Sequence, residues 1–163
     1  MTAISLSVRQ PWAWALIHGG KVVENRGRVP AGSWRLVGRR VFIHAAKGMT
    51  RAEYEDACRF MQSIGVDCPR PDQLPRGGVI GTMRLAAIIS DVESPVGTVV
   101  LAGEEGADDI GHSSWFFGPY GLVMEAPLAI VPMPGPGQLG WFDFREGGAF
   151  DAPKPWMRNW EAV

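Results

Sequence analysis

Gly19-Gly20-Lys21-Val22-Val23-Glu24-Asn25-Arg26 is the stretch of sequence around which the rest of the chain is organised. Glycine accepts backbone angles that other residues resist, so the glycine pair predicts a turn, and the two valines predict the start of a strand. Side chains alternate along a strand, which places Glu24 and Arg26 on one face and Asn25 on the other. With Lys21 at the mouth of the turn, the stretch brings an amine, a carboxylate and a guanidinium close together.

This set of charges has two interpretations. A pocket for an anionic or polar planar ligand uses lysine as a mobile cation and arginine as a rigid fork, with a carboxylate to orient them or to move a proton. Alternatively, Glu24 and Arg26 form a same-face ion pair on the surface, which contributes little to stability. These residues alone leave both interpretations open, and the rest of the chain favours the pocket.

The composition is that of one globular domain. With 163 residues the chain is long enough to bury a core, and 46% apolar and 20% charged residues are ordinary for a soluble protein. No apolar run approaches the roughly 20 residues that span a bilayer, and the first residues do not resemble a secretory signal, so we expect a cytoplasmic protein that does not bind membranes. Cys58 and Cys68 are expected to be free thiols, and neither a metal nor a cofactor is expected.

Charge is distributed unevenly along the chain. Residues 1–50 hold eight Lys or Arg and one acid, whereas residues 51–110 hold five Lys or Arg and eleven acids. One basic end on a nearly neutral protein indicates a local anion-binding face. The alternative is that the basic and acidic segments pair with each other in the fold, and the sequence leaves both open.

Hydrophobic periodicity predicts about six strands and two helices. Pro11 is well placed to begin a helix that ends at Gly19, and Thr50 with Glu53 forms a capping box for a second helix that runs to about Ile64. Gly81 inside a long strand predicts a bulge or a close approach by another backbone. The predicted strands are 4–8, 41–45, 79–89, 122–126, 128–131 and 140–144, with a further extended run from Val22, and the predicted helices are 12–18 and 51–64. This order favours an α+β fold, a small mixed β-barrel with about two flanking helices.

Two segments are expected to lie outside these elements. Residues 90–114 are rich in acids and glycines, so they predict a surface excursion from a domain that covers residues 1–145. Their acidic pairs fit a solvated loop better than a metal site. Residues 146–163 form a C-terminal tail whose Trp156 and Trp160 either lie over the barrel or dock a partner protein.

A few further side chains are candidates for a site. Lys47 lies where a strand ends beside a glycine, a place where pockets open. His44, inside an apolar strand, is either a buried core histidine or a general base. Trp12 and Trp14 flank one helix face and cannot both share it, so one of them is expected to be partly exposed, where a base can stack on it.

Three stretches together resemble the ASCH domain, the activating-signal-cointegrator homology domain of the PUA-like superfamily. They are Leu6-Ser7-Val8-Arg9-Gln10-Pro11-Trp12-Ala13, the pattern Gly19-x-Lys21-x-x-Glu24-x-Arg26, and Trp115-Phe116-Phe117-Gly118-Pro119-Tyr120-Gly121. Each motif is weak alone, but their order and spacing make the combination specific. The resemblance covers residues 4–144.

The resemblance implies a PUA-like barrel with a cleft over the signature residues, and RNA or a modified nucleotide as the ligand. It places Lys21, Glu24 and Arg26 in the cleft. Gln10 and Trp12 are expected at its edge, and the turn from Trp115 to Tyr120 in the opposite wall. Together with Lys47 from the strand end, the predicted ligand-binding residues are Gln10, Trp12, Lys21, Glu24, Arg26, Lys47, Trp115 and Tyr120.

An enzymatic role is the alternative. Some small bacterial members of the family are similar to amidohydrolases that act on acetylated cytidine, with a lysine that matches Lys21 and a threonine nucleophile three residues later. Glu24 stands at that threonine position here, so the nucleophile is not carried over. Glu24 can instead activate water while Lys21 stabilises the oxyanion, or can act as the base of a metal-independent ribonuclease. Lys21 and Glu24 are the predicted catalytic residues if the protein is an enzyme.

Overall fold

The fold is built on one mixed β-sheet. The computed structural model describes residues 3–92 and 94–162, and within them seven strands belong to this sheet. The strands are β1 (Ile4–Val8), β2 (Val23–Arg26), β3 (Arg40–Ala45), β4 (Gly78–Ser90), β5 (Val99–Gly103), β6 (Tyr120–Pro134) and β7 (Trp141–Asp143). The α-helices are α1 (Trp12–His18), α2 (Arg51–Ser63) and α3 (Pro155–Arg158). Short 3₁₀ helices are η1 (Ser33–Arg35), η2 (Pro71–Gln73) and η3 (Ala107–His112).

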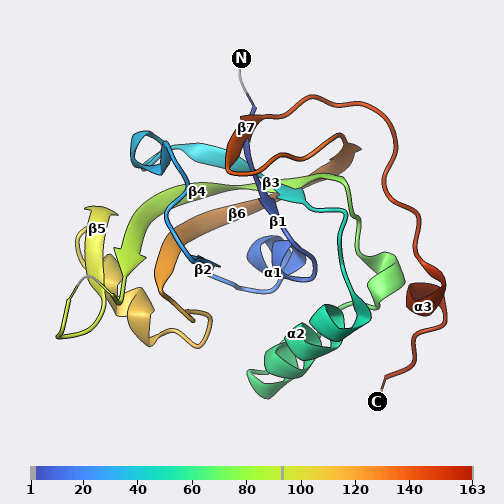
Figure 1. Ribbon diagram of the computed structural model, residues 1–163, viewed down its shortest axis with the longest axis horizontal. Coiled ribbons are helices and arrows are strands. Elements are labelled where there is room, and N and C mark those ends of the chain that lie inside the picture. Colours follow the sequence, from blue (N-terminus) through green and yellow to red (C-terminus); the bar gives the residue numbers. More distant parts are fainter. Residues whose placement is uncertain (1–2, 93, 163) are drawn as a thin grey trace.

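The sheet curls into an open half-barrel. Its strand order is β2-β6-β4-β3-β1-β7, with β5 added to one end of β4. The pair β1 and β3 is parallel and the other pairs are antiparallel. The long strands β4 and β6 curve side by side, and α1 packs against both of them, while α2 lies farther out (Figure 1). The predicted α+β class, with two principal helices beside a small mixed barrel, is confirmed.

Gly81 explains how α1 approaches the sheet. The pairing of β4 with β6 shifts register on both sides of this glycine, as the sequence predicted. A Cβ atom at Gly81 would lie 2.6 Å from Cδ1 of Ile17 and 2.7 Å from the carbonyl oxygen of Leu128. The helix and the neighbouring strand therefore both pack directly on the glycine backbone.

The helix predictions hold at the starts of the helices. Thr50 and Glu53 form the predicted capping box at the start of α2. Tyr54, Ala57 and Met61 are buried on one face of this helix, while Cys58 and Ile64 are half-buried. The largest apolar cluster lies between α1 and the sheet, and its buried members include Leu6, Leu16, Ile43, Leu85, Ile88 and Leu122.

Two elements differ from the predictions. The segment at 90–114, of which residue 93 lies outside the described residues, contributes β5 to the sheet and contains η3. β6 is one continuous strand where the sequence predicted two, and Ala126 bends it with a φ of 51°. Both differences come from pairing with β4, a long-range partner that periodicity within a window does not reveal.

The tail at 146–162, which we call the C-terminal strap, runs along the edge of the molecule and ends beside α2 (Figure 1). Met157 of α3 is fully buried, and the rings of Trp156 and Trp160 pack against Tyr54 of α2 at 6.0 Å and 5.2 Å between centroids. Arg76, just before β4, is also buried and binds Asp151 and the carbonyl of Ala152. The strap therefore packs on the chain itself, against α2 and the segment before β4, and does not lie over the barrel.

Candidate functional site

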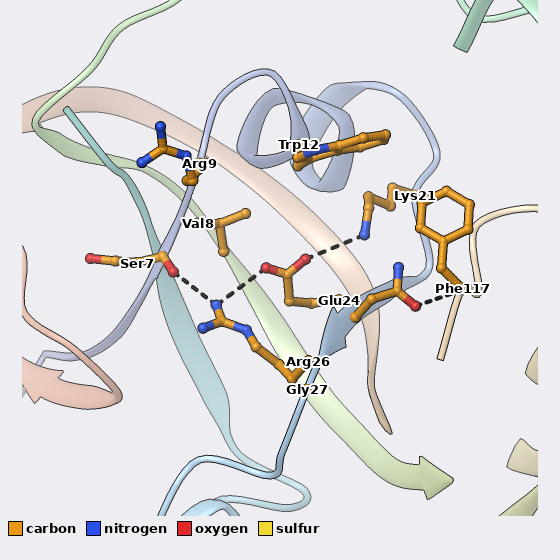
Figure 2. Close-up of a pocket in the computed structure, with 10 residues that line it drawn as sticks. Ser7, Val8, Arg9, Trp12, Lys21, Glu24, Arg26, Gly27 and Phe117 are labelled. Carbon is orange, nitrogen blue, oxygen red and sulfur yellow. Dashed lines mark hydrogen bonds and ion pairs between the residues drawn. The ribbon is translucent and has the colours of Figure 1, made fainter. Parts of the chain in front are cut away.

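A pocket of about 340 Å³ opens where β1, α1 and β2 meet. Figure 2 shows its lining side chains, which come from those elements and from the turn before β6. The lining residues are Ser7, Val8, Arg9, Trp12, Lys21, Glu24, Asn25, Arg26, Gly27 and Phe117. Three of the predicted motifs thus meet at one place.

The glycine turn sets the position of Lys21. A Cβ atom at Gly19 would lie 2.9 Å from both Cα of Ala15 and the Trp14 ring, so a side chain would clash where the chain leaves α1. Gly20 has a φ of +78°, a region that glycine enters without strain. The backbone N–H of Lys21 then donates to the carbonyl of Ala15, which returns the chain beside α1 before β2 begins.

A chain of polar contacts runs across the pocket (Figure 2). Lys21 Nζ donates to the carbonyl of Val23 and lies 3.4 Å from Oε1 of Glu24. The other carboxylate oxygen, Oε2, accepts from Nη2 of Arg26 at 3.2 Å, and the same nitrogen donates to the carbonyl of Ser7 at 2.8 Å. Glu24 is therefore held between two cations, on the shared face that strand alternation predicted.

The Lys21–Glu24 pair is buried and Arg26 is half-buried, which rejects the surface interpretation. Lys21 is 2% exposed and Glu24 is 8% exposed, so little water screens their charges. Burial lowers the pKa of Lys21 below its ordinary value of 10.5, the Glu24 carboxylate partly offsets this, and the Arg26 charge lowers the pKa further. With all three groups ionised, the set carries one net positive charge toward the pocket.

Aromatic rings form the opposite wall. The Trp12 ring lies 5.6 Å from Lys21 Nζ and makes edge contacts with Trp115 and Phe117, at 6.5 Å and 6.0 Å between centroids. Phe117 is 54% exposed and lines the pocket, whereas Trp115 is buried behind Trp12. Asn25 fixes this wall by accepting from the N–H of Phe117 at 2.7 Å and donating to the carbonyl of Trp115 at 2.8 Å.

The structure brings together half of the predicted ligand-binding set. Those that line the pocket are Trp12, Lys21, Glu24 and Arg26. Gln10 is buried and bonds to the N–H of Trp14 and the carbonyl of Pro75, which is a structural position. Lys47 is exposed, Trp115 supports the wall from behind, and Tyr120 faces Arg26 across the β2–β6 pair, but none of these three lines the pocket.

Sequence reasoning missed several lining residues. Ser7 contributes its backbone carbonyl, which no side-chain pattern marks. Asn25 was expected to point away from the charged face, and it does, but it binds the aromatic turn that closes the pocket. Phe117 lies within the quoted aromatic motif, but the sequence does not show that its ring is exposed. In the structure it is 54% exposed and lines the pocket.

His44 belongs to the core. It is buried, its Nε2 lies 2.8 Å from the carbonyl of Gly135, and its Nδ1 lies 3.1 Å from Oγ of Ser7. Burial lowers its pKa below 6.5, which favours the neutral ring. Among the described residues, no group of three or more His, Cys, Asp or Glu is placed to hold a metal ion, and Cys58 and Cys68 are free thiols.

Comparison with known proteins gives matches at the level of structure. No family model matches the chain, and no curated protein matches it. ASCH from Zymomonas mobilis matches with 21% identity and a TM-score of 0.40, over 80% of this chain and 72% of that chain. A tyrosine-to-phenylalanine variant of that protein matches with 20% identity and a TM-score of 0.40, over 82% and 76%. A serine-to-alanine variant matches with 18% identity and a TM-score of 0.39, over 98% and 95%.

The names of the matched structures include ASCH, which is the family that the three sequence motifs resemble. In the described part of the chain, no helix has the length and apolar character needed to cross a membrane.

Proposed function

We propose that the protein binds RNA or a modified nucleotide, with one base in the pocket between β1, α1 and β2. The observation that carries this proposal is the buried Lys21–Glu24–Arg26 set, which faces the rings of Trp12 and Phe117 across a pocket of about 340 Å³. Buried ionic groups are costly to hold unless they are paired, and placing them on a pocket wall is typical of a ligand site.

The pocket chemistry suits a base. Lys21 and Arg26 supply N–H donors for a carbonyl edge, and Glu24 supplies acceptor oxygens for an amino group. An exposed ring of Phe117 beside Trp12 offers a surface on which a base can stack, a contact worth about 1–3 kcal/mol per base. A duplex keeps its base edges paired and stacked, so a pocket of this kind favours a single-stranded segment.

The charge distribution supports an anionic ligand. Of the cations in residues 1–50, only Arg9, Lys21 and Arg26 form ion pairs within the described part of the chain. Arg9 alone pairs with the acidic segment at 51–110, through Glu53 at 2.7 Å. The basic end is therefore mostly not neutralised by that segment, which leaves positive charge for phosphates.

The test uses one end-labelled structured RNA in EDTA with the wild type, Lys21→Met and Lys154→Met. Methionine keeps the volume of the lysine stem and removes the charge, and Lys154 is an exposed lysine outside the pocket, which makes it the matched control. We expect a shift on a native gel, weakened by salt, that is lost in Lys21→Met and kept in Lys154→Met. Binding that is insensitive to salt and to Lys21→Met contradicts the proposal.

A metal-independent hydrolase is the second candidate, and a specific observation favours it. Burial lowers the pKa of Lys21, a property of amines that take part in catalysis, and the lysine touches a carboxylate in the pocket. Against it, each oxygen of Glu24 already binds one cation, which leaves a single lone pair on each oxygen to accept a proton from water.

The hydrolase is tested with RNA and with acylated cytidine nucleosides as substrates, without added metal. Turnover that disappears in Glu24→Gln, while the variant keeps its fold and its ligand affinity, supports the enzyme. Full turnover in Glu24→Gln excludes this mechanism. Intact RNA on a denaturing gel together with a native-gel shift leaves the binding function alone.

A further inference from the structure

A second pocket of about 890 Å³ adjoins the first. Its walls are Arg26, Gly27, Arg28, Val29, Pro30, Ala31, Leu139 and Gly140. Arg26 and Gly27 line both pockets, so the two pockets adjoin at the end of β2. A ligand that fills the first pocket and extends past Arg26 therefore enters the second.

The second pocket has a cation that nothing in the described chain engages. Arg28 is exposed and lines the pocket, and it forms neither a hydrogen bond nor an ion pair with the described residues. The Nε atom of Arg26, at the junction, is buried and likewise has no partner among them. Arg28 therefore offers an unpaired guanidinium two residues from Arg26, whose own charge is shared with Glu24, and this arrangement suits an anionic group beside the first pocket.

The rest of the second pocket is apolar. Val29 and Pro30 form part of one side, and Leu139, which is 100% exposed, stands at another. The two pockets together therefore offer aromatic rings, the charged set that ends at Arg26, the unpaired Arg28 and an apolar surface. A single-stranded nucleic acid alternates planar bases with phosphates, whereas a mononucleotide leaves the second pocket empty.

We infer that the second pocket is a subsite for the neighbouring nucleotide, so that the ligand is a single-stranded oligonucleotide whose linking phosphate lies between Arg26 and Arg28. The inference rests on the proposed function, because it takes the first pocket as the base site. The second base or its sugar packs on the apolar surface of Val29, Pro30 and Leu139. Arg28 is then the residue that distinguishes an oligonucleotide from a mononucleotide.

The experiment compares ribonucleoside 5′-monophosphates with the ribodinucleotides made from the same bases, by calorimetry at fixed salt. The proteins are the wild type, Arg28→Gln and the control Arg59→Gln, which removes the same charge from an exposed site on α2. We expect the best dinucleotide to bind at least about tenfold more tightly than the best mononucleotide, the effect of one charge-assisted contact with a partly stacked base. Arg28→Gln should remove that gain, so that the dinucleotide binds no more tightly than the mononucleotide, and Arg59→Gln should change neither affinity.

The outcomes separate the inference from the proposed function. Equal affinity for dinucleotides and mononucleotides, with mononucleotides still bound, overturns the subsite and keeps the first pocket. A dinucleotide gain that survives Arg28→Gln also overturns it. Competition by polyglutamate as strong as that by the dinucleotide assigns the second pocket to an acidic peptide and overturns the nucleotide subsite. If no nucleotide binds at all, the proposed function fails, and the inference fails with it.

Discussion

Lys21 and Arg76 are both nearly inaccessible cations, yet the chain uses them in opposite ways. Arg76 is 1% exposed, and it donates hydrogen bonds to the carbonyls of Lys47 and Ala152 and to the carboxylate of Asp151, the last at 3.2 Å. Lys21 is 2% exposed, but its ammonium lies on the wall of a pocket with Glu24 beside it and an aromatic ring over it. A buried cation bonded on every side ties segments together, whereas one that borders a cavity is placed for a ligand.

The largest expected effect is the loss of stability in Arg76→Met. The substitution leaves two carbonyls and the Asp151 carboxylate without their donor and releases the C-terminal strap from the start of β4. Asp151 is 37% exposed, so water can solvate its charge, and the cost comes from the lost hydrogen bonds of a buried guanidinium, about 2 kcal/mol. Urea denaturation should therefore show a free energy of unfolding lower by about 2 kcal/mol.

Arg59→Met is the control for that measurement, because Arg59 and its partner Asp56 are both exposed on α2. Its unfolding free energy should stay within about 0.5 kcal/mol of the wild type. If Arg76→Met destabilises the protein no more than Arg59→Met does, the strap is held by its buried side chains alone. The folded Arg76→Met variant should keep its nucleotide affinity, since Arg76 does not line the pocket.

The sequence distinguished these two cations only in part. Lys21 was found because its partner Glu24 lies three residues away, in the same turn and strand, and the same local logic predicted the capping box of α2 and the bulge at Gly81. Arg76 gave no signal, because Asp151 lies 75 residues away and becomes a partner only when the strap is in place. Interactions set by neighbours were predictable, and those set by the closing of the sheet were not.

The second largest effect is expected for Lys21→Met, which should weaken nucleotide binding and leave the stability nearly unchanged. The methionine relieves the cost of burying a charge and keeps the volume, and Glu24 retains Arg26 at 3.2 Å. We expect the free energy of unfolding to change by no more than about 1 kcal/mol, while nucleotide affinity falls about tenfold or more. A loss of stability as large as that in Arg76→Met would mean that Lys21 is a structural cation as well.

The third prediction concerns pH. Burial lowers the pKa of Lys21 in the folded protein below 10.5, so between the folded value and 10.5 the unfolded chain binds more protons than the folded one. Stability contributed by this group therefore rises as pH rises through that window, and below it the buried charge destabilises the fold by a constant amount. Compared with Lys21→Met, the wild type should gain stability on raising the pH toward 10.5, and it should lose affinity for an anionic ligand as the ammonium deprotonates. A parallel response of both proteins would mean that the pKa of Lys21 is not lowered.

Some pocket residues could likewise be predicted from their neighbours in the sequence, and others depend on contacts with distant segments. Glu24 and Arg26 follow from alternation in one strand, and Trp12 follows from its place at the start of α1. The choice of Phe117 over Trp115 and Tyr120 as the exposed wall depends on how the turn before β6 packs, which is decided by Asn25 from another strand. Lys47 was predicted from its glycine neighbour, but its side chain lies against Gly77 and does not line the pocket.

The smallest effect tests whether this distant clamp matters. Asn25→Asp keeps the acceptor for the N–H of Phe117 but replaces the donor to the Trp115 carbonyl with a second oxygen, which repels that carbonyl. Loss of one such bond should weaken nucleotide binding by about 1 kcal/mol, roughly fivefold, with the ring of Phe117 displaced from the wall. A nucleotide titration gives the affinity, and the difference in total tryptophan fluorescence from the wild type, to which Trp12 and Trp115 contribute, reports a change in the wall. Unchanged affinity with unchanged fluorescence would mean that ring packing alone positions the turn, and the pocket would then depend on the charged set far more than on its aromatic side.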